Sequence, residues 1–211
     1  MILPLLYPII EFSHFAAADD PLDEMLVFTE ELLSAGATLI QYRDKSSNSG
    51  RFLSHARELR RVMRDRAALI INDRPDLALA CDADGVHLGQ DDLSPEAARR
   101  IFTAAGREKM LVGFSTHNLD QVRLADAMPI DYLAVGPVFA TSSKANPDPV
   151  IGVEGVRQAR AATEKPLVAI GGITRGNYRE VREAGADSVA VISDLFESPG
   201  KAVADFLRVL G

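Results

Sequence analysis

Residues 68–92 read ALIINDRPDLALACDADGVHLGQDD, and this stretch decides the fold. Two short apolar runs, ALIIND (68–73) and GVHLG (85–89), lie about one strand–helix–strand unit apart, and each leads into acidic residues. Near-continuous apolar runs that alternate with helical segments are typical of parallel strands buried on both faces. The stretch therefore predicts one β/α unit of a parallel sheet, with polar side chains where its strands end.

The same pattern recurs along the whole chain. Six further runs resemble these two: LYPII (6–10), TLIQYR (38–43), LVGFS (111–115), YLAVGPVF (132–139), PLVAIGG (166–172) and SVAVIS (188–193). Eight β/α units in 211 residues predict an α/β fold, a closed (β/α)₈ TIM barrel that forms one domain over residues 1–211. An open doubly wound sheet is the alternative, although no GxGxxG follows the first run.

Amphipathic segments separate the predicted strands. In DEMLVFTEELLSAG (23–36) and RFLSHARELRRVMRDRA (51–67), apolar residues recur every three or four positions, as on one face of a helix. Gly36 is a typical helix stop. These segments are expected to cover the outside of the sheet.

Composition limits the partners. With 23 basic and 30 acidic residues, the formal net charge is −7 and the sequence pI is about 5.1, which disfavours nucleic acid and anionic membranes. A single cysteine, Cys81, permits no intramolecular disulfide, so a reducing cytoplasm is the expected setting. The opening MILPLLYPIIEF lacks a basic leader and is interrupted by Pro4 and Pro8, so we interpret it as a buried strand. Oligomeric state stays open, and a homo-oligomer is compatible with these data.

In such barrels, the chemistry lies at the carboxyl ends of the strands. The second predicted strand ends in QYRDK (41–45), whose alternation places Gln41, Arg43 and Lys45 on one face and Tyr42 and Asp44 on the other. If that first face is the inner one, Arg43 and Lys45 offer a guanidinium fork and a point charge for phosphate oxygens. A solvated turn at the surface is the alternative.

Two carboxylates follow neighbouring strands. Asp73 follows the third strand and Asp92 follows the fourth, so their side chains are expected to share one ion. Magnesium prefers one or two carboxylates together with phosphates and water. The alternative role of Asp92 is to cap the next helix, but Ser94 before Pro95 is the better cap. Between Asp91 and Asp92 the spacing alone does not decide, and we favour Asp92.

The later strand ends contain hydroxyls and glycines. Thr141 and Ser143 before Lys144 predict a diphosphate clamp, whose alternative is a mobile loop without a catalytic role. The Gly171–Gly172 pair predicts an uncharged phosphate site after the seventh strand, although such a pair can equally serve tight packing.

Several of these motifs occur, at separate strand ends and in the same order, in one enzyme family. They are QYRDK (41–45), NDR (72–74), HLGQDD (87–92), GFSTH (113–117), GPVFATSSK (136–144), GGIT (171–174) and VISDLF (191–196). On these residues, nearly the whole chain resembles the thiamine-phosphate synthases, most clearly over 38–196. The resemblance implies a transferase that joins 4-amino-2-methyl-5-(diphosphooxymethyl)pyrimidine to a thiazole phosphate with Mg²⁺, giving thiamine phosphate and diphosphate.

The resemblance also implies roles for individual residues. The pyrimidine diphosphate would contact Gln41, Tyr42, Arg43, Asp44, Lys45, Asn72, Ser115 and Lys144. The thiazole phosphate would contact Thr141, Ser142, Ser143, Gly172, Ile192 and Ser193, beside the Gly171 backbone. Asp73 and Asp92 would bind Mg²⁺. The expected catalytic residues are Arg43, Lys45, Lys144 and Ser115, the three cations by stabilising the departing diphosphate.

The chain also departs from the family pattern. Ala140 stands where the family often has proline, Ser143 replaces a threonine, and Glu11 lies where the first strand usually ends in a Thr-Asp pair, so we assign Glu11 no role. A related thiazole tautomerase and a non-catalytic phosphate sensor are the alternatives. The retained Lys45, Asp73, Asp92 and Lys144 favour the synthase.

Overall fold

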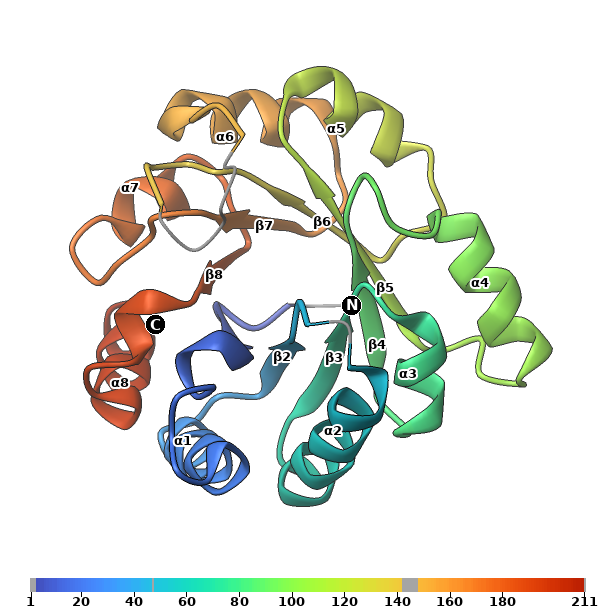
Figure 1. Cartoon of the computed structure of the whole chain (residues 1–211). Coiled ribbons are helices and arrows are strands. Elements are labelled where there is room, and N and C mark those ends of the chain that lie inside the picture. Colours follow the sequence, from blue (N-terminus) through green and yellow to red (C-terminus); the bar gives the residue numbers. More distant parts are fainter. Residues whose placement is uncertain (1–2, 47, 142–147, 211) are drawn as a thin grey trace.

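The computed structural model describes residues 3–46, 48–141 and 148–210, and within them eight parallel strands close into a barrel in chain order (Figure 1). The strands are β1 (Leu6–Glu11), β2 (Leu39–Arg43), β3 (Ala68–Asn72), β4 (Gly85–Leu88), β5 (Leu111–Thr116), β6 (Tyr132–Val135), β7 (Leu167–Ile170) and β8 (Ser188–Val191). Closure is shown by the pairing of β1 with β8, in which Leu6 lies opposite Val189. The closed barrel is confirmed, and the open sheet is wrong.

A ring of helices covers the outside of the barrel (Figure 1). The helices are α1 (Pro21–Ser34), α2 (Ser49–Met63), α3 (Pro75–Ala80), α4 (Pro95–Ala104), α5 (Leu119–Asp126), α6 (Gly152–Ala162), α7 (Tyr178–Glu183) and α8 (Pro199–Leu210), with short 3₁₀ segments η1 (Phe12–His14) and η2 (Ser193–Leu195). Gly36 ends the first helical segment at φ 103°. Ser94 caps α4 by accepting a hydrogen bond from Ala97 N at 3.2 Å, as the sequence predicts.

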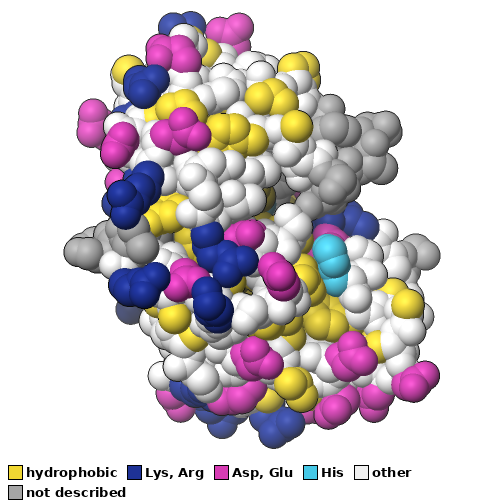
Figure 2. Space-filling view, turned by 90° about the vertical axis from the view of Figure 1, so that its left-hand side faces the viewer, with side chains coloured by type: hydrophobic (Ala, Val, Ile, Leu, Met, Phe, Trp, Pro, Cys, Tyr) yellow, Lys and Arg dark blue, Asp and Glu magenta, His cyan; other side chains and the backbone are white. Residues whose placement is uncertain are grey.

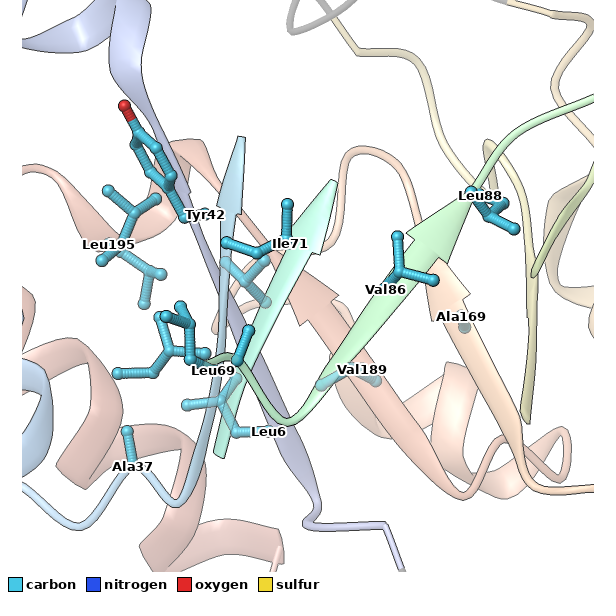
Figure 3. Close-up of a cluster of buried hydrophobic side chains, with 14 of the residues drawn as sticks. Leu6, Ala37, Tyr42, Leu69, Ile71, Val86, Leu88, Ala169, Val189 and Leu195 are labelled. Atoms are coloured by element: carbon cyan, nitrogen blue, oxygen red, sulfur yellow. The ribbon is translucent and has the colours of Figure 1, made fainter. Parts of the chain in front are cut away.

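Apolar side chains fill both sides of the strands. The outer layer packs between the strands and the helices, where Leu6, Leu69 and Val86 belong to one large buried cluster (Figure 3). A smaller cluster inside the barrel includes Tyr7 and Tyr132. Burial on both faces explains why the strands read as continuous apolar runs.

Several strands are shorter than the sequence predicts, and β6 and β7 are each shorter by three or more residues. The run 132–139 yields only β6, which ends at Val135, because Pro137 has no N–H to continue the ladder. The run 166–172 yields β7, which ends at Ile170, because Gly171 and Gly172 take left-handed φ values of 100° and 62°. Beyond both ends, Val138 N donates to Ile170 O at 2.9 Å and Phe139 N donates to Gly171 O at 3.0 Å, so the two segments are joined at the rim of the barrel.

Surface charge on the face in Figure 2 is of both signs. Lys and Arg side chains are interspersed there with Asp and Glu side chains. Within the described part of the chain, no helix combines the length and apolarity needed to cross a membrane.

Candidate active site

A pocket with a volume of about 460 Å³ opens at the carboxyl ends of the strands. Side chains from most of the strand ends and from the loops that follow them line it. The predicted site residues among the lining are Gln41, Arg43, Lys45, Asn72, Asp73, Asp92, Ser115, Thr141, Gly171 and Ile192. The barrel thus brings together predicted residues that lie up to 151 positions apart, between Gln41 and Ile192.

Strand β2 sends alternate side chains to opposite sides. Gln41, Arg43 and Lys45 line the pocket, which confirms the inner face predicted from alternation. Tyr42 and Asp44, on the other face, are not part of the described lining, so the substrate contacts that the resemblance implies for them stay predictions.

Both side chains instead contact α2 and the loop before it. The Tyr42 hydroxyl lies 3.1 Å from His55 Nδ1, and Figure 3 shows Tyr42 beside Leu195 among buried apolar side chains. Asp44 accepts hydrogen bonds from Ser46 N at 2.8 Å and Arg51 Nη2 at 3.2 Å. The physical reason is the two-residue period of a strand, which sends every second side chain of the motif to the outer side.

Arg43 forms an ion pair with Glu11, the last residue of β1. The Glu11 residue is only 4% exposed, and burial also lowers the pKa of Arg43, an effect that Asp73 opposes. The adjacent strands β1 and β2 place the two residues directly opposite each other. Glu11, which was assigned no role from the sequence, therefore holds the guanidinium at the rim.

Asp73 and Asp92 face each other in the pocket. Burial, followed by a hydrogen-bond contact with Asp73, raises the pKa of Asp92. Lys45 Nζ lies 2.5 Å from Asp73 Oδ2, and Asp92 Oδ2 accepts a hydrogen bond from Gly89 N at 2.7 Å. The prediction that these two carboxylates meet is confirmed, and the contact with Asp73 favours Asp92 over Asp91.

The backbone at Asp73 is strained. Its φ of 65° lies in the left-handed region, which costs a non-glycine residue roughly 1 kcal/mol or more. Asp73 N donates to His87 O of β4 at 2.8 Å, which fixes the turn against the neighbouring strand. This conformation ends β3 with the Asp73 carboxylate in the pocket beside Asp92.

Polar side chains also occupy the base of the pocket. Ser115 Oγ lies 2.8 Å from His87 Nε2, and His87 Nδ1 lies 3.1 Å from the Tyr132 hydroxyl. Burial lowers the pKa of His87 to about 4, so the ring is neutral near pH 7. The Tyr7 hydroxyl lies 2.8 Å from the Tyr132 hydroxyl and accepts from Gln41 Nε2 at 3.0 Å.

The opposite side of the pocket is formed by β7, β8 and the loop after β6. Gly171 and Ile192 line the pocket, whereas Gly172 and Ser193 are not part of the described lining. A Cβ on Gly172 would lie 2.5 Å from Ala140 O, so the pair also serves the tight packing that the sequence left as an alternative. Ser142, Ser143 and Lys144 lie outside the described residues, so their predicted roles stay predictions.

Sequence reasoning missed several residues of the pocket. Tyr7 and His87 project into it from β1 and β4, and alternation was the available signal: Tyr7 shares the inner face with Ile9, and His87 follows the outward-facing Val86. His117, whose role the sequence left open, lines the pocket and has its Nδ1 2.7 Å from Gly136 O and 3.5 Å from Asp148 Oδ2.

Acidic groups outnumber basic groups in the described lining. Arg43 and Lys45 face a larger set of carboxylates, Asp73, Asp91, Asp92 and Asp148. Among the described residues, no cluster of three or more His, Cys, Asp or Glu side chains could hold a metal ion by itself. The Asp73–Asp92 pair nevertheless offers the hard oxygen ligands of Mg²⁺, which commonly takes its remaining ligands from phosphates and water.

A closed parallel barrel with a charged pocket at the carboxyl ends of its strands defines a (β/α)₈-barrel enzyme. A family model described as thiamine monophosphate synthase matches residues 14–195. The chain therefore belongs to the thiamine monophosphate synthase family.

Individual relatives agree with this assignment. The chain is 51% identical to the thiamine-phosphate synthase of Koribacter versatilis (strain Ellin345), over 99% of this chain and 96% of that protein. It is 44% identical to that of Albidiferax ferrireducens (strain ATCC BAA-621 / DSM 15236 / T118), over 82% and 77% of the two chains. A solved structure of thiamine phosphate pyrophosphorylase from Pyrococcus furiosus superposes with a TM-score of 0.82 at 33% identity, covering 97% of this chain and 94% of that one.

Proposed function

We infer that the chain condenses 4-amino-2-methyl-5-(diphosphooxymethyl)pyrimidine with a carboxy- or hydroxyethyl-thiazole phosphate, giving thiamine phosphate and diphosphate. Family membership supports the reaction. The observation that carries the assignment within this pocket is the meeting of Asp73 and Asp92 beside Lys45 and Arg43. We place the departing diphosphate on this side, at the ends of β2, β3 and β4.

Magnesium suits this place because the pocket has too few described cations for a diphosphate. Burial and the contact with Asp73 raise the pKa of Asp92, which shows that two negative charges are costly there. A divalent cation would remove that cost, and Asp73 and Asp92 would hold it. When bound, Mg²⁺ would supply positive charge to the diphosphate oxygens.

The side chains then act by electrostatics and position. As the bond from the pyrimidine methylene carbon to the diphosphate oxygen breaks, Arg43 and Lys45 stabilise the charge that develops on the diphosphate. We expect Lys144 to do the same. The electron-rich aminopyrimidine stabilises the carbon cation, and the thiazole nitrogen then attacks that carbon. No side-chain nucleophile is required, so alignment of the two substrates is the main task of the barrel.

The thiazole phosphate is assigned to the opposite side of the pocket. Gly171 and Ile192 line it there, and Thr141 adds a hydroxyl at the edge of the loop after β6. Arg175, which could otherwise bind a phosphate in this region, is ion-paired with Asp194 at 2.9 Å. Backbone groups and hydroxyls therefore remain as the phosphate ligands we propose.

The isomerase alternative gains no support from the pocket. An isomerase that acts on one thiazole phosphate would need no acidic pair and no diphosphate cations, yet Lys45, Asp73 and Asp92 lie together. The acidic overall charge and the buried, unpaired Cys81 further support small-molecule substrates and a cytoplasmic setting, and oligomeric state stays open.

Diphosphate release tests the proposed function. The purified protein is incubated with both substrates and Mg²⁺, and diphosphate and thiamine phosphate are measured together. We expect both products to form in equal amounts and to require the metal. Diphosphate-free conversion of the thiazole phosphate alone, unaffected by a chelator, would instead support the isomerase.

A further inference from the structure

A continuous chain of hydrogen bonds crosses the inside of the barrel beneath the pocket. It runs from Gln41 on β2 through Tyr7 and Tyr132 to His87, and ends at Ser115 on β5. The four distances between successive polar atoms are 3.0, 2.8, 3.1 and 2.8 Å. The first four residues are at least 92% buried, so water has little access to these atoms.

One direction of donation gives every polar atom of these four hydrogen bonds a suitable role. Gln41 Nε2 can only donate, so the Tyr7 hydroxyl accepts from it and, in this direction, donates its own O–H to Tyr132. Tyr132 then donates to His87 Nδ1. A neutral imidazole that accepts at Nδ1 carries its proton on Nε2 and donates it to Ser115 Oγ.

The two ends of this hydrogen-bond chain therefore offer opposite groups to a ligand, an acceptor at one end and a donor at the other. Gln41 commits its amide NH₂ to Tyr7, which leaves its carbonyl oxygen as an acceptor at the pocket. Ser115 Oγ accepts a hydrogen bond from His87 Nε2, which leaves the Ser115 hydroxyl proton free to donate to a ligand. If the direction of donation reverses at one end, every hydrogen bond between the two ends must reverse its direction as well.

We propose that Tyr7, Tyr132 and His87 are positioning residues that couple the Gln41 amide to the Ser115 hydroxyl. The coupled pair selects a ligand edge that donates a hydrogen bond to Gln41 and accepts one from Ser115. An aminopyrimidine has such an edge, since its exocyclic amine donates and its ring nitrogens accept. The identity of this ligand rests on the proposed function, whereas the donor-to-acceptor direction of the hydrogen bonds does not.

The side-chain packing around these hydrogen bonds leaves room for the rings that form them. Gly113 on β5 lies against both rings: a Cβ there would be 2.1 Å from Tyr132 Cζ and 2.5 Å from His87 Nδ1. The His87 and Tyr132 rings stack at 5.5 Å between centroids, and Tyr7 meets Tyr132 edge to face at 6.0 Å. No larger residue at 113 would allow the hydroxyl and the imidazole to meet.

The tautomer of His87 reports the polarity without any turnover. Nitrogen NMR of the wild-type protein is expected to show an unprotonated Nδ1 and a protonated Nε2 on His87, with the His87→Gln variant used for assignment. In Gln41→Glu, the carboxylate can only accept from Tyr7, and Arg43 on the same strand face favours its ionised form. The chain should then reverse and move the His87 proton to Nδ1.

The double variant Gln41→Glu/Tyr132→Phe supplies the matched control, because the link is broken. Its His87 tautomer should equal that of Tyr132→Phe alone. A wild-type Nδ1–H tautomer, or a His87 tautomer unchanged by Gln41→Glu in folded protein, would overturn the proposal. Neither result would bear on whether diphosphate is released. Failure of the proposed hydrogen-bond direction can therefore be distinguished from failure of the proposed function.

Kinetics supply a second measurement that does not depend on Gln41→Glu folding. Tyr132→Phe is expected to raise KM for the pyrimidine diphosphate about tenfold while KM for the thiazole phosphate stays within about twofold. Tyr178→Phe removes the hydroxyl of another buried tyrosine, which has no hydrogen-bond partner among the described residues, and should change neither value. Equal changes in both KM values for Tyr132→Phe would show a merely structural role and contradict the proposal.

Discussion

The two sides of the pocket differ in charge. At the ends of β2, β3 and β4, charged side chains dominate: Arg43 and Lys45 lie among carboxylates that include Asp73 and Asp92. At the ends of β7 and β8, the described lining is uncharged and consists of Ile170, Gly171 and Ile192. Strong, metal-assisted charge suits a group whose charge grows during the reaction, whereas fixed backbone dipoles suit a phosphate that only has to be held.

The largest expected effect concerns the acidic pair. Asp92→Asn keeps the shape of the side chain but removes its charge, and we expect diphosphate release to fall about a hundredfold or more, which corresponds to about 3 kcal/mol of transition-state stabilisation. Raised Mg²⁺ should restore part of the rate. Steady-state rates over a magnesium titration provide the measurement.

Asp91→Asn is the matched control, because Asp91 also lines the pocket while the contact with Asp73 is made by Asp92. A small effect on this variant would confine the metal to the Asp73–Asp92 pair. Should Asp91→Asn lose more activity than Asp92→Asn, the choice between the two aspartates would be reversed.

Arg43→Lys addresses the same side without removing its charge. The ammonium cannot reproduce the planar fork that Arg43 offers to Glu11 and to an oxyanion, so we expect kcat to fall about 30-fold, roughly 2 kcal/mol. KM for the thiazole phosphate should change little. Full activity in Arg43→Lys would show that only a point charge is needed there.

Gly172→Ala tests the uncharged side. Its φ of 62° disfavours a Cβ, and the added carbon would lie 2.5 Å from Ala140 O, so the loop must shift. We expect KM for the thiazole phosphate to rise about tenfold, about 1.4 kcal/mol, with KM for the pyrimidine diphosphate nearly unchanged. Separate titration of the two substrates measures both.

Gly176→Ala provides the control in the same loop, since among the described residues a Cβ there would meet only Thr174 Oγ1, at 3.6 Å. Equal effects of the two alanine variants on KM would argue against a specific role of Gly172 in holding this phosphate.

The smallest effect on activity is expected for Tyr42→Phe, on the outer side of β2. Its hydroxyl contacts His55 rather than the pocket, so both KM values and kcat should stay within about twofold. Loss of the buried contact should lower the free energy of unfolding by about 1 kcal/mol, as measured by urea denaturation. A selective rise in KM for the pyrimidine diphosphate would restore the ligand role that the family motif implies for Tyr42.

The sequence predicted the barrel and the acidic pair because both follow from local order. Apolar runs of strand length give the eight strands, and consecutive parallel strands necessarily bring Asp73 and Asp92 to neighbouring ends. Alternation along β2 also predicted that Tyr42 lies on the outer face, where its hydroxyl contacts His55, whereas the substrate contact that the resemblance implies for Tyr42 stays a prediction.

Other features depend on contacts that no local pattern reveals. Glu11 pairs with Arg43 across two strands, and Tyr7 meets Tyr132 across 125 positions of sequence. These residues read as ordinary parts of apolar strands, so only closure of the barrel shows that their polar atoms meet. The left-handed backbone of Asp73 is equally invisible in the sequence, because aspartate tolerates but does not require it.

Anomalous diffraction from a crystal soaked with Mn²⁺ and inorganic diphosphate tests the central claim most directly, because manganese can replace magnesium at oxygen ligands. We expect one strong peak between the Asp73 and Asp92 carboxylates, within coordination distance of both and of the diphosphate. Manganese bound elsewhere in the pocket, with these two side chains uncoordinated, would contradict the account.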